Sequence, residues 1–409
     1  MVDKNKILLT KPETGELNKT LVASEFPYGA PGNTEFPLYL NTGSCGRKPV
    51  SVIKALEEGW RKLNQNPTLT TFFETELRED ARTMAAEMFG VERDLLMLTE
   101  STTEGLQLMM QTYLLKEGDE LVTTDHEHGC LNTIARHLEE TRGIVVRRHK
   151  VEPELGSHHH CQSIEKLVTP RTKLVVVSEI DCFTGWRPNL DTLIAECHLS
   201  GMPLLIDGAH APGQGPVDVS RYHSWVSSAH KWLGSPNGIG FAYFDRKILE
   251  DLKPVWVGHK YFETRAASSS PVWALECRGT EDSVKFMGLQ AALKLQRQLG
   301  ERNIAARQLE IMRFARDLIA EKLNPTFLLP SPDQMPANEL TALLAFDFEP
   351  SRLLVDDLVQ ALWQKEKIWI QPDYLLPTPG HGVRISCHYS LGEADIERFV
   401  KALSAFVKP

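Results

Sequence analysis

Strand-like apolar runs alternate with helical patterns through the first two-thirds of the chain, and this alternation restricts the folds open to it. The runs cover residues 94–99, 119–125, 143–151, 173–179, 203–209 and 239–244. Leu106, Met109 and Tyr113 give the segment after the first run a helical spacing. Such a pattern predicts βα units around a buried, mostly parallel sheet. Because ligands of such sheets bind beyond the C-terminal strand ends, the polar residues after each run are the candidates for function.

The pattern changes near residue 281. Two long amphipathic helices are expected at 281–300 and 303–323. Strand-like runs at 341–348, 367–371 and 382–389 and a helix at 393–406 complete the chain. We therefore expect a large domain over residues 31–285 and a smaller α+β domain formed by residues 1–30 and 286–409.

Composition limits the class of protein. The chain has 42% hydrophobic and 24% charged residues, as in a soluble globular enzyme, and a net charge of −9 argues against nucleic-acid or anionic-membrane partners. The N-terminal residues show no secretory signal, and no apolar run is long enough to span a bilayer. Seven scattered cysteines fit a reducing compartment better than a disulfide framework. These features predict a cytoplasmic protein.

A histidine run at residues 158–161, HHHC, raises the possibility of a metal site. Three adjacent histidines cannot all face one ion from a regular element, and no second ligand cluster stands at a useful spacing. We expect a polar loop here and no bound metal.

Polar side chains that could together bind a phosphate-bearing cofactor follow successive strand-like runs. A helix start offers free N–H groups and a favourable dipole to an anion, and hydroxyls add donors. A carboxylate, imidazoles and a lysine follow later runs. These residues are Ser101, Thr102, Thr103, His128, Asp207, His210 and Lys231.

This set of side chains suits pyridoxal phosphate. Lysine can bond to the cofactor's aldehyde and later move the substrate's Cα proton. A carboxylate keeps the pyridine nitrogen protonated, an imidazole can stack on the ring, and the helix start can bind the phosphate. Some of these residues also have a simpler explanation: Asp207 can be a turn residue, and Thr102 and Thr103 can be helix caps. Thr280, further along the chain, can likewise be the N-cap of a helix at EDSV.

Over roughly residues 36–395 the chain resembles the class V aminotransferase group of fold-type I enzymes. That group includes cysteine desulfurases, isopenicillin N epimerase-like proteins and cysteine C–S lyases. The resemblance implies a large, mostly parallel seven-stranded sheet domain and a smaller C-terminal α+β domain. The matching motifs are DHEH at 125–128, DGAH at 207–210, SSAHK at 227–231, ECRGT at 276–280 and VRIS at 383–386.

The resemblance also implies roles around the cofactor ring. Lys231 matches the lysine that holds the cofactor covalently, and Asp207 matches the partner of the pyridine nitrogen. His128 matches the histidine that stacks on the ring, and His210 a residue near the 3-hydroxyl. Asp181 stands where many relatives carry an asparagine beside the cofactor, so its role is open.

Further matches concern the phosphate, the substrate and a second subunit. Thr103, Ser228 and His230 match phosphate-side residues, and Ser101 and Thr102 replace the usual small pair before the threonine. Thr280 matches a residue that reaches the phosphate of the neighbouring subunit, which implies a homodimer. Arg384 matches the arginine that pairs with the substrate's α-carboxylate, a bidentate task suited to guanidinium.

Two N-terminal stretches narrow the reaction. YLNTGSCGRKP at 39–49 resembles the LN-x-GS-x-G segment of isopenicillin N epimerase-like proteins, which places Asn41 and Gly43 near the substrate. NPTLTTFFE at 66–74 resembles their NP…FF stretch. Desulfurases need a cysteine on a loop shortly before the carboxylate-binding arginine, and none lies between Cys277 and Cys387. A persulfide-forming desulfurase is therefore not expected.

The sequence thus predicts an enzyme that cleaves the Cα–H bond of an L-amino acid or derivative with Lys231, as an epimerase or a β-eliminating C–S lyase. An aminotransferase or an oxidative decarboxylase or deaminase of the same fold is an alternative. A pyridoxal-phosphate-binding regulatory protein without catalysis is an alternative from another class. A sugar aminotransferase fits less well because Arg384 suits a carboxylate substrate.

Overall fold

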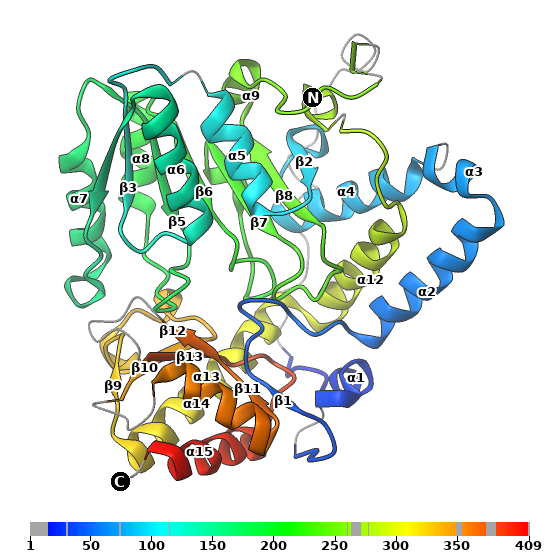
Figure 1. Cartoon of the computed structure of the whole chain (residues 1–409), viewed down its shortest axis with the longest axis vertical. Coiled ribbons are helices and arrows are strands. Elements are labelled where there is room, and N and C mark those ends of the chain that lie inside the picture. Colours follow the sequence, from blue (N-terminus) through cyan, green and yellow to red (C-terminus); the bar gives the residue numbers. More distant parts are fainter. Residues whose placement is uncertain are drawn as a thin grey trace.

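The computed structural model describes residues 15–29, 32–72, 75–113, 115–259, 261–262, 271–276, 278–348, 354–373 and 382–407. A seven-stranded sheet occupies one part of the molecule, and a second sheet with the C-terminal helices occupies the other (Figure 1). In the large sheet, β8 runs antiparallel to its neighbours β2 and β7, and the remaining pairs are parallel. Its strands in spatial order are β2 (Leu96–Thr99), β8 (Gly240–Phe244), β7 (Ser224–Ser228), β6 (Leu204–Asp207), β5 (Thr172–Ser178), β3 (Glu120–Thr124) and β4 (Val145–His149).

This sheet confirms the predicted fold class and adds one strand that was not predicted from the apolar runs. β7 has the sequence SWVSS, in which only Trp225 and Val226 are apolar, yet all five residues are buried. Its serines are tolerated inside because their hydroxyls have hydrogen-bond partners: Ser228 pairs with Thr102, and the other two donate to backbone carbonyls at the start of β6 and just after it. Ser224 donates to the Leu204 carbonyl at 2.9 Å and Ser227 to the Gly208 carbonyl at 2.8 Å.

Helices cover the sheet on its faces. Four consecutive β5 residues, at positions 174–177, are fully buried, as expected for a strand covered on both sides. α5 (Thr102–Thr112) and α6 (Gly129–Arg142) lie side by side in front of the sheet in Figure 1. α7 (Gly156–Leu167) and α8 (Asp191–Ser200) form a second packed pair.

The histidine run lies in α7, so the predicted polar loop is wrong. His160, Cys161 and Ile164 are buried, because residues three and four apart share one face of a helix. The His160 ring packs edge-on against Trp186, with ring centroids 5.1 Å apart. Within the described ranges, no three side chains of metal-ligating type are grouped to hold an ion.

The C-terminal part begins with the two predicted helices, α12 (Val284–Leu299) and α13 (Glu301–Leu323). A four-stranded antiparallel sheet and the helices α14 (Val355–Ala361) and α15 (Glu393–Val407) follow. In spatial order this sheet contains β12 (Gln371–Asp373), β13 (Gly382–Ser386), β10 (Leu343–Asp347) and β9 (Thr326–Phe327). In the part of the chain that the structure describes, no helix is both long and apolar enough to cross a membrane.

Residues 19–25 and 38–39 lie beside the C-terminal part (Figure 1). β1 (Leu38–Tyr39) pairs in parallel with β11 (Ile368–Trp369). Side chains from α1 (Lys19–Glu25) and its flanks share a buried cluster with the end of α12 and the start of α13. However, α12 also packs against α2 (Val50–Gln65) and α4 (Glu76–Phe89), so the boundary near residue 285 stays a prediction.

Candidate active site

A cavity of about 420 Å³ opens where the strand ends of the large sheet face β13 and the loop after β1. Residues from the ends of β2, β3, β5, β6 and β7 contribute to its wall, as expected for an open α/β sheet. The structure therefore brings most of the predicted site residues together. Those in the wall are Gly43, Ser101, Thr102, Thr103, His128, Asp207, His210, Ser228, His230, Lys231 and Arg384.

One side of the cavity is built to receive an anion. α5 begins at Thr102, and Ser101 is its N-cap, with the Ser101 Oγ accepting from the Glu104 N–H at 3.4 Å. The Thr102 N–H donates to Ser228 Oγ at 3.1 Å, and the two hydroxyls lie 2.6 Å apart. The first turn of a helix and three hydroxyl-bearing residues thus face one point, an arrangement that suits a phosphate.

His230 adds an orphaned atom on the same side. Its Nδ1 is buried and has no hydrogen-bond partner among the described residues. Burial, with the nearby charges of Lys231 and Lys48, lowers the pKa of His230 to about 4, so the ring is neutral at pH 7. A buried polar atom without a partner in a cavity wall fits a site that a polar ligand completes.

Asp207 supplies a buried carboxylate at the end of β6. Its Oδ1 accepts the Ala209 N–H at 2.9 Å, and the residue is 4% exposed. Burial raises the pKa of Asp207, although the charges of Lys231 and His128 act in the opposite direction. A buried carboxylate is stable as an anion only beside a cationic group. A protonated pyridine nitrogen is such a group.

Lys231 lies in the turn after β7, and its Nζ is 3.0 Å from Nε2 of His210. Burial lowers the pKa of the lysine, with Asp207 opposing the shift, and burial also lowers the pKa of His210. The Trp232 Nε1–H donates to His210 Nδ1 at 3.4 Å on the other side of the ring. The cavity therefore favours an unprotonated amine, the form that can attack an aldehyde or take a proton.

The backbone of Lys231 is held by the loop that carries the GSCG motif. The Gly46 N–H donates to the His230 carbonyl at 2.8 Å, and Lys48 Nζ donates to the same oxygen at 3.1 Å. A Cβ on residue 46 would lie 2.0 Å from the Lys231 carbonyl oxygen. Only glycine allows this approach, which explains the last residue of the motif.

Arg384 enters the cavity from β13. Its Nη1 donates to the Cys182 carbonyl, and its Nη2 donates to Ser44 Oγ at 3.3 Å. A Cβ on Gly43 would lie 3.3 Å from Nη2. Asn41 is buried behind the wall, with Oδ1 at 3.5 Å from Nη2. Asn41 therefore supports the guanidinium, and its contact with the substrate stays a prediction.

Asp181 and Thr280 do not lie in the cavity wall. The Asp181 carboxylate lies 2.6 Å from His126 Nδ1 and accepts from Thr184 Oγ1 at 2.8 Å. Thr280 is exposed, and the N-cap position of α12 is Ser283, so the helix-cap explanation of Thr280 is wrong. Contacts of Asp181 and Thr280 with the cofactor stay predictions.

Several wall residues were not predicted. Ser178 ends β5 and Cys130 follows His128 by two positions, so the strand-end rule could have found both. Most of the other missed residues are sequence neighbours of predicted ones or follow β5, whereas Gln371 and Pro372 come from the C-terminal sheet, whose packing a single sequence does not reveal. The residues missed are Ser44, Gly129, Cys130, Ser178, Ile180, Cys182, Phe183, Ala209, Gln371 and Pro372.

The chain is similar in sequence to enzymes of known type. Isopenicillin N epimerase of Streptomyces clavuligerus is 28% identical over 381 residues, covering 90% of this chain and 94% of its own. The cysteine desulfurase CsdA of Escherichia coli (strain K12) is 27% identical over 287 residues, covering 66% and 70%.

Solved structures share the fold. A C-DES variant with glycine covalently linked to its pyridoxal phosphate cofactor matches with a TM-score of 0.81 at 23% identity, covering 90% of this chain and 97% of that one. An apo cysteine desulfurase from Thermococcus onnurineus NA1 matches with a TM-score of 0.82 at 19% identity, covering 97% and 99%. The sequence profile of the aminotransferase class-V family matches residues 38–398. The chain therefore belongs to the class V aminotransferase family, as its motifs predict.

Proposed function

We propose that this enzyme cleaves the Cα–H bond of an L-amino acid or a derivative, with Lys231 as the base. The observation that carries the proposal is the Lys231 amine, 3.0 Å from His210, in one cavity with Asp207 and Arg384. Burial lowers the pKa of this lysine, which favours the unprotonated amine that can accept a proton.

Pyridoxal phosphate is the cofactor of class V aminotransferases, so membership confirms the predicted cofactor. When bound, it supplies an aldehyde for covalent attachment and a ring that accepts electrons from Cα. Lys231 would hold the aldehyde carbon and Asp207 the pyridine nitrogen. The start of α5, Ser228 and His230 would hold the phosphate.

Arg384 would bind the substrate's α-carboxylate through its guanidinium. The Cys182 carbonyl and Ser44 Oγ fix the orientation of this side chain from one side of the cavity. A substrate whose carboxylate is held there would occupy the cavity that Lys231 also lines. Substrate binding is thus assigned to Arg384 on β13 of the C-terminal sheet, and proton removal to Lys231 after β7 of the large sheet.

The candidate reactions differ in the step after proton removal. A C–S lyase expels a sulfur substituent from Cβ, whereas an epimerase returns a proton to the other face of Cα. The likeness to isopenicillin N epimerases supports the second and the likeness to C-DES supports the first. Cysteine desulfurases are also relatives, but the sequence from 371 to 383 contains no cysteine that could carry a persulfide.

The proposal includes a homodimer, in which Thr280 approaches the cofactor phosphate of the second subunit. Thr280 is exposed in the single chain, as this arrangement requires. Sedimentation or light scattering tests the dimer, and a monomer at micromolar concentration would contradict it.

Product analysis with the purified holoenzyme and a panel of amino acids tests the reaction. Pyruvate with a released thiol selects the lyase, and solvent deuterium at Cα with a D-amino acid selects the epimerase. A new keto acid with transfer of the amino group selects an aminotransferase. Lys231→Ala abolishes each of these, and a variant that turns over normally would overturn the proposal.

A further inference from the structure

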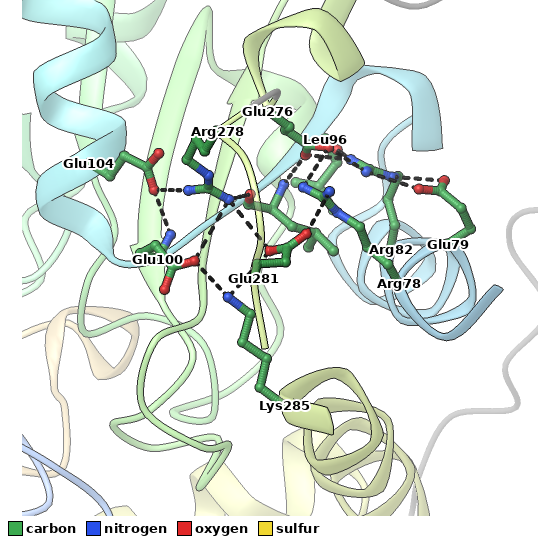
Figure 2. A network of polar contacts seen from close by, with 11 residues as sticks. Arg78, Glu79, Arg82, Leu96, Glu100, Glu104, Glu276, Arg278, Glu281 and Lys285 are labelled. Atoms are coloured by element: carbon green, nitrogen blue, oxygen red, sulfur yellow. Dashed lines mark hydrogen bonds and ion pairs between the residues drawn. The ribbon is translucent and has the colours of Figure 1, made fainter. Parts of the chain in front are cut away.

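A network of charged side chains joins residues 276–285 to the end of β2 and the start of α5 (Figure 2). In its first half, Glu276 accepts from both terminal nitrogens of Arg82, at 2.8 and 2.6 Å. Arg78 also lies 2.9 Å from the Glu276 carboxylate. The same carboxylate accepts the Leu98 N–H at 2.6 Å. The Arg82 and Glu276 side chains are 1% and 3% exposed, so this half fixes the segment firmly to the core.

The second half surrounds the phosphate loop, by which we mean residues 101–103. Glu100 and Glu104 stand directly before and after this loop. Lys285, in the first turn of α12, donates to Glu100 at 2.6 Å, and Arg278 donates to Glu104. Glu104 in turn accepts the Glu100 N–H at 2.6 Å, which closes a ring across the loop.

The same ring touches the turn that follows the active-site lysine. A Cβ on Gly238 would lie 3.2 Å from Oε2 of Glu100, so this carboxylate rests against the turn after Lys231. A Cβ on Gly240 would lie 2.7 Å from the Ser101 carbonyl carbon. The phosphate loop and the segment after Lys231 are therefore packed directly against each other, with no space between them.

Two carboxylates beside a phosphate loop are an electrostatic problem. A phosphate monoester carries a charge of roughly −1.5 to −2 at pH 7, and neighbouring anions oppose its binding. Here each carboxylate has a cationic partner from residues 278–285. Lys285 and Arg278 are 7% and 16% exposed, so solvent screens their charges only weakly.

We propose that Lys285 and Arg278 are positioning residues for the cofactor phosphate: they hold Glu100 and Glu104 in place and neutralise them. The inference rests on the proposed placement of the phosphate at residues 101–103. Neither residue lies in the cavity wall, so both act through the two glutamates and the backbone of the loop.

Cofactor affinity of the Lys285→Met variant tests this inference. We expect its dissociation constant for pyridoxal phosphate to rise roughly tenfold, because Glu100 gains mobility and an uncompensated charge. Lys285→Arg retains the charge and should bind nearly as tightly as the wild type. Glu100→Gln combined with Lys285→Met removes both charges and should recover most of the lost affinity.

Lys294→Met is the matched control, since Lys294 is an exposed lysine on the same helix. Thermal unfolding of each apoprotein, measured beside the cofactor titration, separates lost affinity from lost folding. Equal dissociation constants for pyridoxal phosphate in the Lys285→Met and Lys294→Met variants would overturn the inference. So would a double variant that binds as weakly as the single one. The cofactor titration measures binding and does not depend on turnover. A failure of the proposed reaction would therefore be seen in the product analysis and not in the titration.

Discussion

Nζ of Lys231 lies 3.0 Å from Nε2 of His210, while the indole N–H of Trp232 donates to Nδ1 of the same ring. An indole nitrogen can only donate, so Nδ1 must accept and the proton of the neutral imidazole is on Nε2. That proton points at Lys231 and can bond to the lone pair of its amine. Trp232 thus determines the tautomer of His210, in which the proton is on the nitrogen that faces the reactive amine.

Trp232→Phe should therefore lower kcat/KM by roughly fivefold, the equivalent of one net hydrogen bond of about 1 kcal/mol. Loss of the indole donor also lets Nδ1 take a proton, which raises the pKa of His210. The acid limb of the pH–rate profile should consequently move to higher pH. Trp60→Phe, at a residue that is 53% exposed, is the control. An unchanged profile in Trp232→Phe would show that the tautomer is set by something else.

Gly43→Ala should weaken substrate binding and leave cofactor binding unchanged. The added Cβ would lie 3.0 Å from Leu343 Cδ2 and 3.3 Å from Nη2 of Arg384, so the guanidinium must shift. A misplaced carboxylate partner should raise KM about tenfold. Steady-state kinetics and a cofactor titration measure the two effects separately.

Gly15→Ala is the control for Gly43→Ala, because a Cβ there would meet nothing within 4 Å. Equal KM values in the two variants would contradict a role for the close approach of residue 43 to Arg384.

Glu127→Gln should stabilise the protein at alkaline pH. Glu127 is fully buried, accepting from Ser178 Oγ at 2.6 Å and from Thr124 Oγ1 at 2.8 Å. Burial, with a further contribution from Asp207, raises its pKa to about 8. The folded state therefore binds a proton that the unfolded state has released. The contribution of Glu127 to the free energy of unfolding is fully present below the pKa that this carboxyl has in the unfolded chain. It is lost as the pH rises through the folded-state pKa of about 8.

Glutamine resembles the protonated acid, so Glu127→Gln should match the wild type at pH 5 and exceed it by roughly 2–4 kcal/mol at pH 9. Denaturant unfolding at several pH values measures the difference. Glu58→Gln, on the exposed face of α2, provides the control. Parallel curves for Glu127→Gln and wild type would mean that Glu127 is ionised in the folded protein.

Arg82→Met should lower the free energy of unfolding by about 3–5 kcal/mol, because it leaves the Glu276 carboxylate buried without its bidentate partner. Adding Glu276→Gln should reduce this loss, since the buried carboxylate is then gone and Arg78 keeps Glu281 as a partner. Arg136→Met, which breaks an exposed pair with Glu140, should cost less than about 1 kcal/mol. A similar small loss in Arg82→Met would contradict the importance of the buried pair.

Candidate site residues that lie at or near the ends of strands could be predicted from the sequence. Asp207, Lys231 and Arg384 follow or occupy strand-like segments, and the structure brings all three to one cavity. β7 was missed because its three serine hydroxyls are hydrogen-bonded inside the protein, two to carbonyls and that of Ser228 to Thr102, contacts that no hydrophobic pattern records. The helix at residues 156–167 had a readable signal in the spacing of His160, Cys161 and Ile164, which the histidine run obscured.

Other parts of the site depend on contacts that a single sequence cannot give. Cys182 and Gln371 reach the cavity only because β13 and the loop after β5 pack together. Asp181 turns toward His126, a residue 55 positions away along the chain. The ring of charges around the phosphate loop likewise joins two distant segments, residues 100–104 and 278–285 (Figure 2).

The loop of residues 41–46 contacts the backbone at Lys231 and the guanidinium of Arg384, so the surroundings of the lysine are complete only when three distant segments have met. Such non-local contacts form slowly, because the entropy of closing long loops must be overcome first. The first of these segments leaves the ribosome long before the last. Tight capture of the cofactor should therefore be a late event in folding, and its appearance during refolding would mark the moment when the whole chain is in place.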